Sequence, residues 1–197
     1  LKSLEEYEDS ISNEEKKYWH DINECIKENS IAKLSDEKRR KHKKIVIDNS
    51  IAELLLKFSN AAYNTRIIDL MLSALALSLG DCRNEENIIV NIESHGREDI
   101  FENIDITNTV GWFTTQYPLL LHTVKDADIG SQIKSIKEQC RRVPRNGIGY
   151  GVWRYITQPE NIDFYDPYIS FNYFGEIDKS IYDFEKWSFD FENSGES

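Results

Sequence analysis

The chain has 197 residues, of which 40% are hydrophobic and 12% aromatic, so it can bury the core of one medium-sized domain. Its formal net charge of −11 argues against nucleic-acid binding, which requires a basic face. Because no run of about 18 apolar residues is present and the start is polar and acidic, we expect neither a membrane span nor a signal peptide.

The three cysteines are Cys25, Cys82 and Cys140, and they match neither a disulfide framework nor the paired spacing of a zinc site. We therefore expect three ordinary thiols in a cytoplasmic protein that binds no metal. The chain begins at Leu1 rather than at a methionine, which indicates a piece of a longer protein.

The first elements are a helix, a charged connector and a strand. Ser12 and Glu15 form a capping box in front of an apolar stripe, which predicts an amphipathic helix at 13–28. The basic run at 33–44 is interpreted as a solvated connector rather than as a patch for an acidic partner. The apolar string "KIVID" at 44–48 predicts a short strand.

Two further helices follow. A second capping box, which starts at Ser50, predicts a helix at 51–62. Either Asn64 or Thr65 is expected to cap the next helix, at 66–79. This helix is apolar on most of its faces, so we expect it to be buried.

The second half of the chain predicts three strands, a helix and a turn. "NIIVNIE" at 87–93, "QYPLLLHTV" at 116–124 and "YISFNYFG" at 168–175 read as strands. An apolar stripe predicts a helix at 129–142, and the three glycines of "NGIGYG" at 146–151 predict a turn. The order of helices and strands predicts one α/β or α+β lobe in which helices pack on a mixed sheet.

The string "NIESHGRED" places unusual charge at the end of a predicted buried strand. Glu93 in this position is a candidate general acid or base, and Arg97 could pin this carboxylate or hold an anion. The residues alone favour a salt-bridged turn that closes the strand. His95 is interpreted as a structural hydrogen-bond donor rather than as a base or a ligand.

Two polar side chains lie in otherwise apolar, aromatic strings. Tyr117 in "VGWFTTQYP" could donate a hydrogen bond into a cleft, or be an ordinary buried aromatic residue. Asn172 in "SFNYFG" requires partners if it is buried, either on a neighbouring strand or on a substrate. The "NGIGYG" glycines fit neither the dinucleotide pattern nor a P-loop, so they give only a weak indication of phosphate binding.

Taken together, five strings resemble the epimerization domains of nonribosomal peptide synthetases, in the condensation-domain superfamily. They are "AAYNTRIIDLMLSALALSLG", "IESHGRED", "TVGWFTTQYPLLL", "NGIGYGVWRY" and "ISFNYFGEID", and the resemblance covers about residues 10 to 175. It implies a chloramphenicol-acetyltransferase-like fold of two lobes with a tunnel between them. The family's first lobe carries a His-His-x-x-x-Asp-Gly motif. None of the four histidines here are adjacent, so the chain is expected to be the C-terminal lobe alone, without the family's last strands.

The resemblance also implies the chemistry. Glu93 matches the family's acid/base residue, and Arg97, Tyr117 and Asn172 match positions around the reacting centre, while Ser94 stands where the family usually has glycine. The substrate would be an aminoacyl or peptidyl thioester on the 4'-phosphopantetheine of a peptidyl carrier domain, and its α-carbon would be inverted from L to D. No bound cofactor is implied.

The implied partners are the N-terminal lobe and the adenylation and condensation modules of the same antibiotic-producing synthetase, and the chain alone is expected to be inactive. Two alternatives stay open. One is a condensation domain that forms peptide bonds, which the tryptophan and Tyr-Pro of "VGWFTTQYP" disfavour. The other is a non-catalytic lobe that docks a carrier domain. A His-His-x-x-x-Asp-Gly motif upstream would favour an enzyme over the docking lobe.

Overall fold

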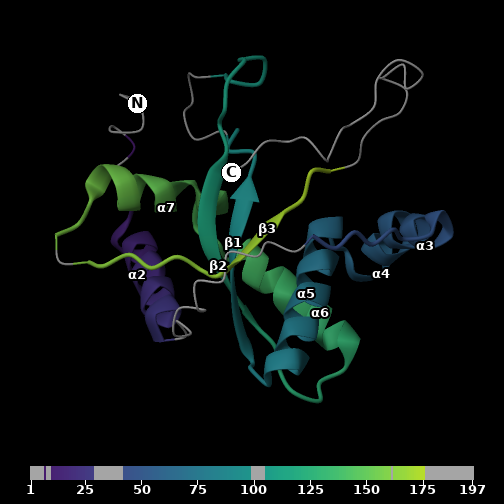
Figure 1. Ribbon diagram of the computed structural model, residues 1–197. Coiled ribbons are helices and arrows are strands. Elements are labelled where there is room, and N and C mark those ends of the chain that lie inside the picture. Colours follow the sequence, from purple (N-terminus) through teal and green to yellow (C-terminus); the bar gives the residue numbers. More distant parts are fainter. Residues whose placement is uncertain (1–6, 8–9, 29–41, 99–104, 161, 176–197) are drawn as a thin grey trace.

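The computed structural model describes residues 7, 10–28, 42–98, 105–160 and 162–175. Figure 1 shows three strands side by side in the middle, with helices α2 and α7 to their left and α5 and α6 to their right. The elements are α2 Asn13–Glu28, α3 Asn49–Glu53, α4 Asn60–Tyr63, α5 Ile67–Arg83, β1 Asn87–Ser94, β2 Thr115–His122, α6 Ile129–Arg141, α7 Ile148–Val152 and β3 Ile169–Asn172.

The sheet is mixed, as predicted. Its strand order is β2-β1-β3, with β1 antiparallel to β2 and parallel to β3. The central strand β1 and its neighbour β2 cover nearly the whole of their predicted ranges, whereas β3 is shorter than the predicted 168–175. The predicted strand at 44–48 is wrong, because these residues form no regular structure and Ile45 and Val46 are 74% and 81% exposed.

One face of the sheet carries the hydrophobic core. Ile88, Val90 and Ile92 alternate along β1 and are buried, while the residues between them are only partly buried. Core residues of the helices, including Trp19 of α2 and Ile136 of α6, belong to the same buried cluster. The residues paired with the three β1 positions on this face are Leu121, Leu119 and Tyr117 of β2, and Ile169 and Phe171 of β3.

The predicted helix at 13–28 is confirmed as α2, and one half of its capping box is formed. The Ser12 hydroxyl accepts the backbone N–H of Glu15 at 3.1 Å. The Glu15 carboxylate instead accepts the indole N–H of Trp19 at 3.4 Å. This contact links the first turn of the helix to the core residue at its centre.

The predicted helix at 51–62 is present as a run of helical turns from Asn49 to Tyr63, with a π-helical segment at Leu54–Ser59. Its cap is Asp48, which accepts the backbone N–H of Ser50 at 2.9 Å, rather than Ser50 itself. Most of the basic run at 33–44 lies outside the described residues.

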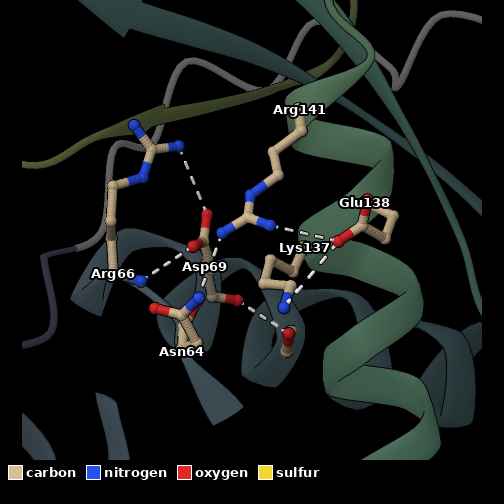
Figure 2. Close-up of polar contacts among 7 residues, drawn as sticks. Asn64, Arg66, Asp69, Lys137, Glu138 and Arg141 are labelled. Atoms are coloured by element: carbon tan, nitrogen blue, oxygen red, sulfur yellow. Dashed lines mark hydrogen bonds and ion pairs between the residues drawn. The ribbon is translucent and has the colours of Figure 1, made fainter. Parts of the chain in front are cut away.

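The α4–α5 connection is tied to α6 by charged side chains (Figure 2). The Asp69 carboxylate, which is 1% exposed, accepts the backbone N–H of Arg66 at 2.8 Å, so it caps α5 in place of the predicted Asn64 or Thr65. Arg141 of α6 donates to the carbonyl of Asn64 at 3.2 Å. The helix continues beyond the predicted residue 79 to Arg83, because left-handed Asn84 ends it rather than a glycine.

Two glutamines of α6 pair with the end of β2 and the residues just after it. Gln139 accepts the N–H of His122 at 2.7 Å and donates to its carbonyl at 2.9 Å. Two helical turns earlier in α6, Gln132 accepts the N–H of Val124 at 3.2 Å and donates to its carbonyl. We call these four hydrogen bonds the glutamine clamp, because each amide binds both backbone groups of one residue as a neighbouring strand does.

Candidate functional site

Two polar residues meet on the face of the sheet opposite the core. Glu93 near the end of β1 is the register partner of Asn172, the last residue of β3. Adjacent strands lie about 4.8 Å apart, and register partners project from the same face, so the two side chains are neighbours. Glu93 is half-buried and Asn172 exposed, and neither side chain makes a hydrogen bond or ion pair with the described part of the chain. A carboxylate and a carboxamide are therefore available side by side.

Arg97 is directed to a different partner. Its guanidinium donates to three backbone carbonyls: Ile106 at 2.6 Å, Thr109 at 2.9 Å and Gly111 at 3.4 Å. It also lies over the Phe113 ring, 4.4 Å from the centroid. Among the described residues no ion pair joins Arg97 to Glu93, so the salt-bridged turn favoured by the sequence is not formed there.

The turn after β1 packs directly on this second loop. Gly96 has a φ of +63°, and a Cβ at this position would lie 1.6 Å from the carbonyl oxygen of Phe113. Only glycine allows the two backbones to approach so closely. The "SHGR" turn therefore forms one structural unit with the "GWF" segment, although the two are separated in the sequence. This unit lies at the end of the sheet where Glu93 lies.

Tyr117 lies on the core face, because it pairs with Ile92 rather than with Glu93. Its ring is 6.2 Å from that of Trp19, and a Cβ on Gly147 would lie 2.0 Å from its Cδ1. Burial is the main cause that raises the pKa of Tyr117 to about 12, so the hydroxyl is protonated near neutral pH. The structure thus brings Glu93 and Asn172 together, and sets Tyr117 behind the sheet and Arg97 in the adjoining loop.

The loop after β1 is also joined to the glycine-rich segment. Asn146 donates to the Glu98 carboxylate at 2.8 Å, a link that sequence spacing did not indicate. Asn146 has a φ of +52°, and asparagine tolerates this conformation, which is the one signal that could have drawn attention to it. His95 accepts the backbone N–H of Arg97 at 2.9 Å, so it makes a structural hydrogen bond, but as an acceptor rather than as the predicted donor.

The glycine-rich string is only partly a turn. Its first residues end a short 3-10 helix at Pro144–Gly147, and α7 begins at Ile148. Because α7 is a single short helix, it offers no further support for phosphate binding. Among the described residues, no group of three His, Cys, Asp or Glu side chains could hold a metal ion, and no helix is long and apolar enough to cross a membrane.

Val110 was not singled out from the sequence, and Trp112 was used there only to distinguish an epimerization domain from a condensation domain. They are 100% and 89% exposed, although both are large and apolar. They alternate with Thr109, Gly111 and Phe113, which contact Arg97.

Comparison with known proteins gives a consistent assignment. The family model described as the condensation domain matches residues 2–196. Gramicidin S synthase 1 of Brevibacillus brevis is 38% identical over 90% of this chain, which corresponds to 17% of that protein. Tyrocidine synthase 1 of Brevibacillus parabrevis is 38% identical over 83% of this chain and 16% of its own length. The chain therefore spans about a sixth of these relatives.

A solved structure has the same fold. The epimerization domain from the third module of tyrocidine synthetase B superposes with a TM-score of 0.69 at 34% identity. The match covers 86% of this chain and 41% of that domain. The predicted chloramphenicol-acetyltransferase-like lobe, with helices on a mixed sheet, is thus confirmed as the fold of the described residues.

Proposed function

The chain belongs to the condensation-domain family, and on that premise we propose that it is the C-terminal lobe of an epimerization domain in a nonribosomal peptide synthetase. The likeness to a solved epimerization domain and to antibiotic synthetases supports this proposal. A second, N-terminal lobe with the His-His-x-x-x-Asp-Gly motif completes the domain. The substrate arrives as a thioester on the 4'-phosphopantetheine of a peptidyl carrier domain, loaded by adenylation and condensation modules of the same cytoplasmic synthetase.

The reaction exchanges one proton. A base removes the α-proton, the electron pair of the C–H bond moves into the thioester carbonyl, and an acid on the opposite face returns a proton to the α-carbon. Two acid/base groups serve this best, and we assign one role to Glu93 and the other to a histidine of the second lobe. Glu93 suits the role because no cation among the described residues pairs with its carboxylate, which leaves both oxygens available to a substrate proton.

The enolate oxygen needs a fixed hydrogen-bond donor. The Asn172 carboxamide is the register partner of Glu93 and has no partner in the described part of the chain, so its N–H groups are free to donate. Tyr117 supports β1 from the core side, and Arg97 holds the adjoining loop. The adjacent pair of Glu93 and Asn172 on the open face is the single observation that carries the proposal.

The test uses the intact parent synthetase with an L-aminoacyl thioester on its carrier domain. We expect chiral analysis after hydrolysis to give a mixture of L and D residues, together with washout of an α-deuterium label. Peptide-bond formation without washout would instead identify a condensation domain. Neither activity, with retained binding of the carrier domain, would identify a docking lobe.

A further inference from the structure

We propose that Arg97 is a positioning residue, which acts by holding the loop at residues 105–113 in one conformation and not by contacting the substrate. The inference rests on the proposed function only where turnover is measured. Its structural part concerns this chain alone and can be tested without any activity.

The guanidinium of Arg97 binds the loop at several points. One terminal nitrogen donates to the Ile106 carbonyl at 2.6 Å, and the other donates to Thr109 at 2.9 Å and to Gly111 at 3.4 Å. Hydrogen bonds from a charged donor are about twice as strong as neutral ones. The same group lies 4.4 Å from the centroid of the Phe113 ring, which adds a cation–π contact.

These contacts leave little of Arg97 for a substrate. Both terminal nitrogens are engaged with carbonyl oxygens, and the flat side of the guanidinium faces an aromatic ring. A lysine could not replace this arrangement, since its ammonium is a single point charge while the arginine fork reaches three carbonyls at once.

The loop has little else to hold it. Within its described residues the Thr109 N–H bonds to the Ile106 carbonyl at 3.1 Å, and Asp105 accepts the N–H of Thr107 at 2.8 Å. Both bonds are local turns, so they do not attach the loop to β1. Arg97 and the close approach of Gly96 to Phe113 supply that attachment.

The held loop carries two large apolar side chains, Val110 and Trp112, which are almost fully exposed. Because ordering an exposed loop costs conformational entropy, an unheld loop would present these side chains in many positions. Arg97 therefore limits where Val110 and Trp112 can meet the rest of the domain or the bound thioester.

The structural test is hydrogen–deuterium exchange on the full chain. In Arg97→Gln and Arg97→Lys we expect the amides of residues 109–113 to exchange about tenfold faster or more, with the core amides of β1 unchanged. Arg142→Gln is the matched control, because Arg142 is an exposed arginine for which no side-chain bond is described. Unchanged exchange in the loop of both Arg97 variants would overturn the proposal.

A double-mutant cycle on the intact synthetase tests the functional part. Phe113→Leu removes the ring under the guanidinium and disturbs the same loop without touching Arg97. If Arg97 acts through the loop, the combined loss of turnover in Arg97→Gln with Phe113→Leu should be well below the product of the single losses. Independent, multiplicative losses would mean that Arg97 acts on the substrate.

Two further outcomes are informative. If Arg97→Gln unfolds the chain, the exchange of Phe113→Leu alone decides, and we expect a rise of several-fold confined to the loop. If the parent has no epimerase activity, the proposed function fails, while the exchange data still decide whether Arg97 holds the loop.

Discussion

Glu93 and Asn172 are register partners on the parallel strands β1 and β3, and they project from the face opposite that of Ile92 and Phe171. The fully buried residues of β1 all lie on the face of Ile92, so the pair of Glu93 and Asn172 lies outside that part of the core. The two faces of the same strands therefore differ, because one packs into the core and the other carries the two proposed catalytic residues.

Replacement of Glu93 by Gln in the intact parent should affect turnover rather than stability. The rate of α-proton exchange should fall by about a hundredfold or more, which is the usual contribution of a general base. The melting temperature should change little, since the carboxylate makes no hydrogen bond or ion pair within the described residues. Glu86→Gln, an exposed residue before β1, is the control and should retain its turnover. Normal turnover by folded Glu93→Gln would remove Glu93 from the mechanism.

The isolated chain should not racemise a carrier-bound aminoacyl thioester. One wall of the site supplies one proton-transfer group, whereas inversion needs a group on each face of the α-carbon. Chiral chromatography after incubation should therefore give the L residue, at the level of a sample without protein. Accumulation of the D residue above that level would show that a second group is present in this chain.

Removal of one arm of the glutamine clamp should destabilise the fold. Gln132→Met keeps the shape of a buried side chain but leaves the Val124 N–H and carbonyl without their partner. We expect a loss of about 1–3 kcal/mol in the free energy of unfolding, measured with urea. Gln116→Met, at an exposed position of β2, should change it by less than about 0.5 kcal/mol. Equal effects at both positions would deny the clamp a role in stability.

Gly147 and Gly151 should respond differently to alanine. Gly147 has a φ of +84° and a Cβ there would lie 2.0 Å from the Tyr117 ring, so overpacking and backbone strain together predict a loss of about 2–4 kcal/mol. At Gly151 nothing lies within 4 Å of an added Cβ, and alanine there should be neutral or stabilise by up to about 1 kcal/mol. Thermal melting of the pair measures the difference.

Buried thiol and phenol groups should make the fold sensitive to alkali. Burial is the main cause that raises the pKa of Cys140 to about 12 from 9.0, and of Tyr117 to about 12 from 10.0. For both groups the pKa in the folded state lies above that in the unfolded state. The stability that the two protonated groups contribute is therefore complete below about pH 9 and is lost as the pH rises toward 12. Cys140→Ala should reduce the slope of the unfolding free energy against pH between pH 9 and 10. In this range the Cys140 thiol of the unfolded chain ionises before the Tyr117 phenol does. Cys82→Ala, which removes an exposed thiol, should keep the slope of the parent chain.

Periodicity was sufficient to predict the main elements because they bury one continuous stripe or face. The helix at 13–28 and the strand at 87–93 were predicted nearly to the residue. The string at 44–48 has the composition of a strand, but no strand among the described residues pairs with it, and composition alone does not supply a partner strand. Helix ends were missed where the cap was Asp48 or Asp69, since several residues at each end could accept the same hydrogen bond.

The candidate site was predictable in part for the same reason. The period of two along β1 puts Glu93 on the face opposite Ile92, and the family resemblance named Asn172, but only the strand register makes them neighbours. The partners of Arg97 are backbone carbonyls 9 to 14 residues away, and sequence patterns give no information about which carbonyls a side chain will bind.

The glutamine clamp closes the end of one edge of the sheet, so a further strand can be added more readily at the opposite edge. Helices α2, α6 and α7 pack beside β2. The glutamine clamp binds the backbone groups of His122 at the end of this strand. At the opposite edge of the described sheet lies β3, which has β1 as its strand neighbour. A strand added to the described sheet would therefore join beside β3, on the side where Asn172 ends its strand. Such an addition would extend the sheet past the pair of Glu93 and Asn172 and leave the glutamine edge closed.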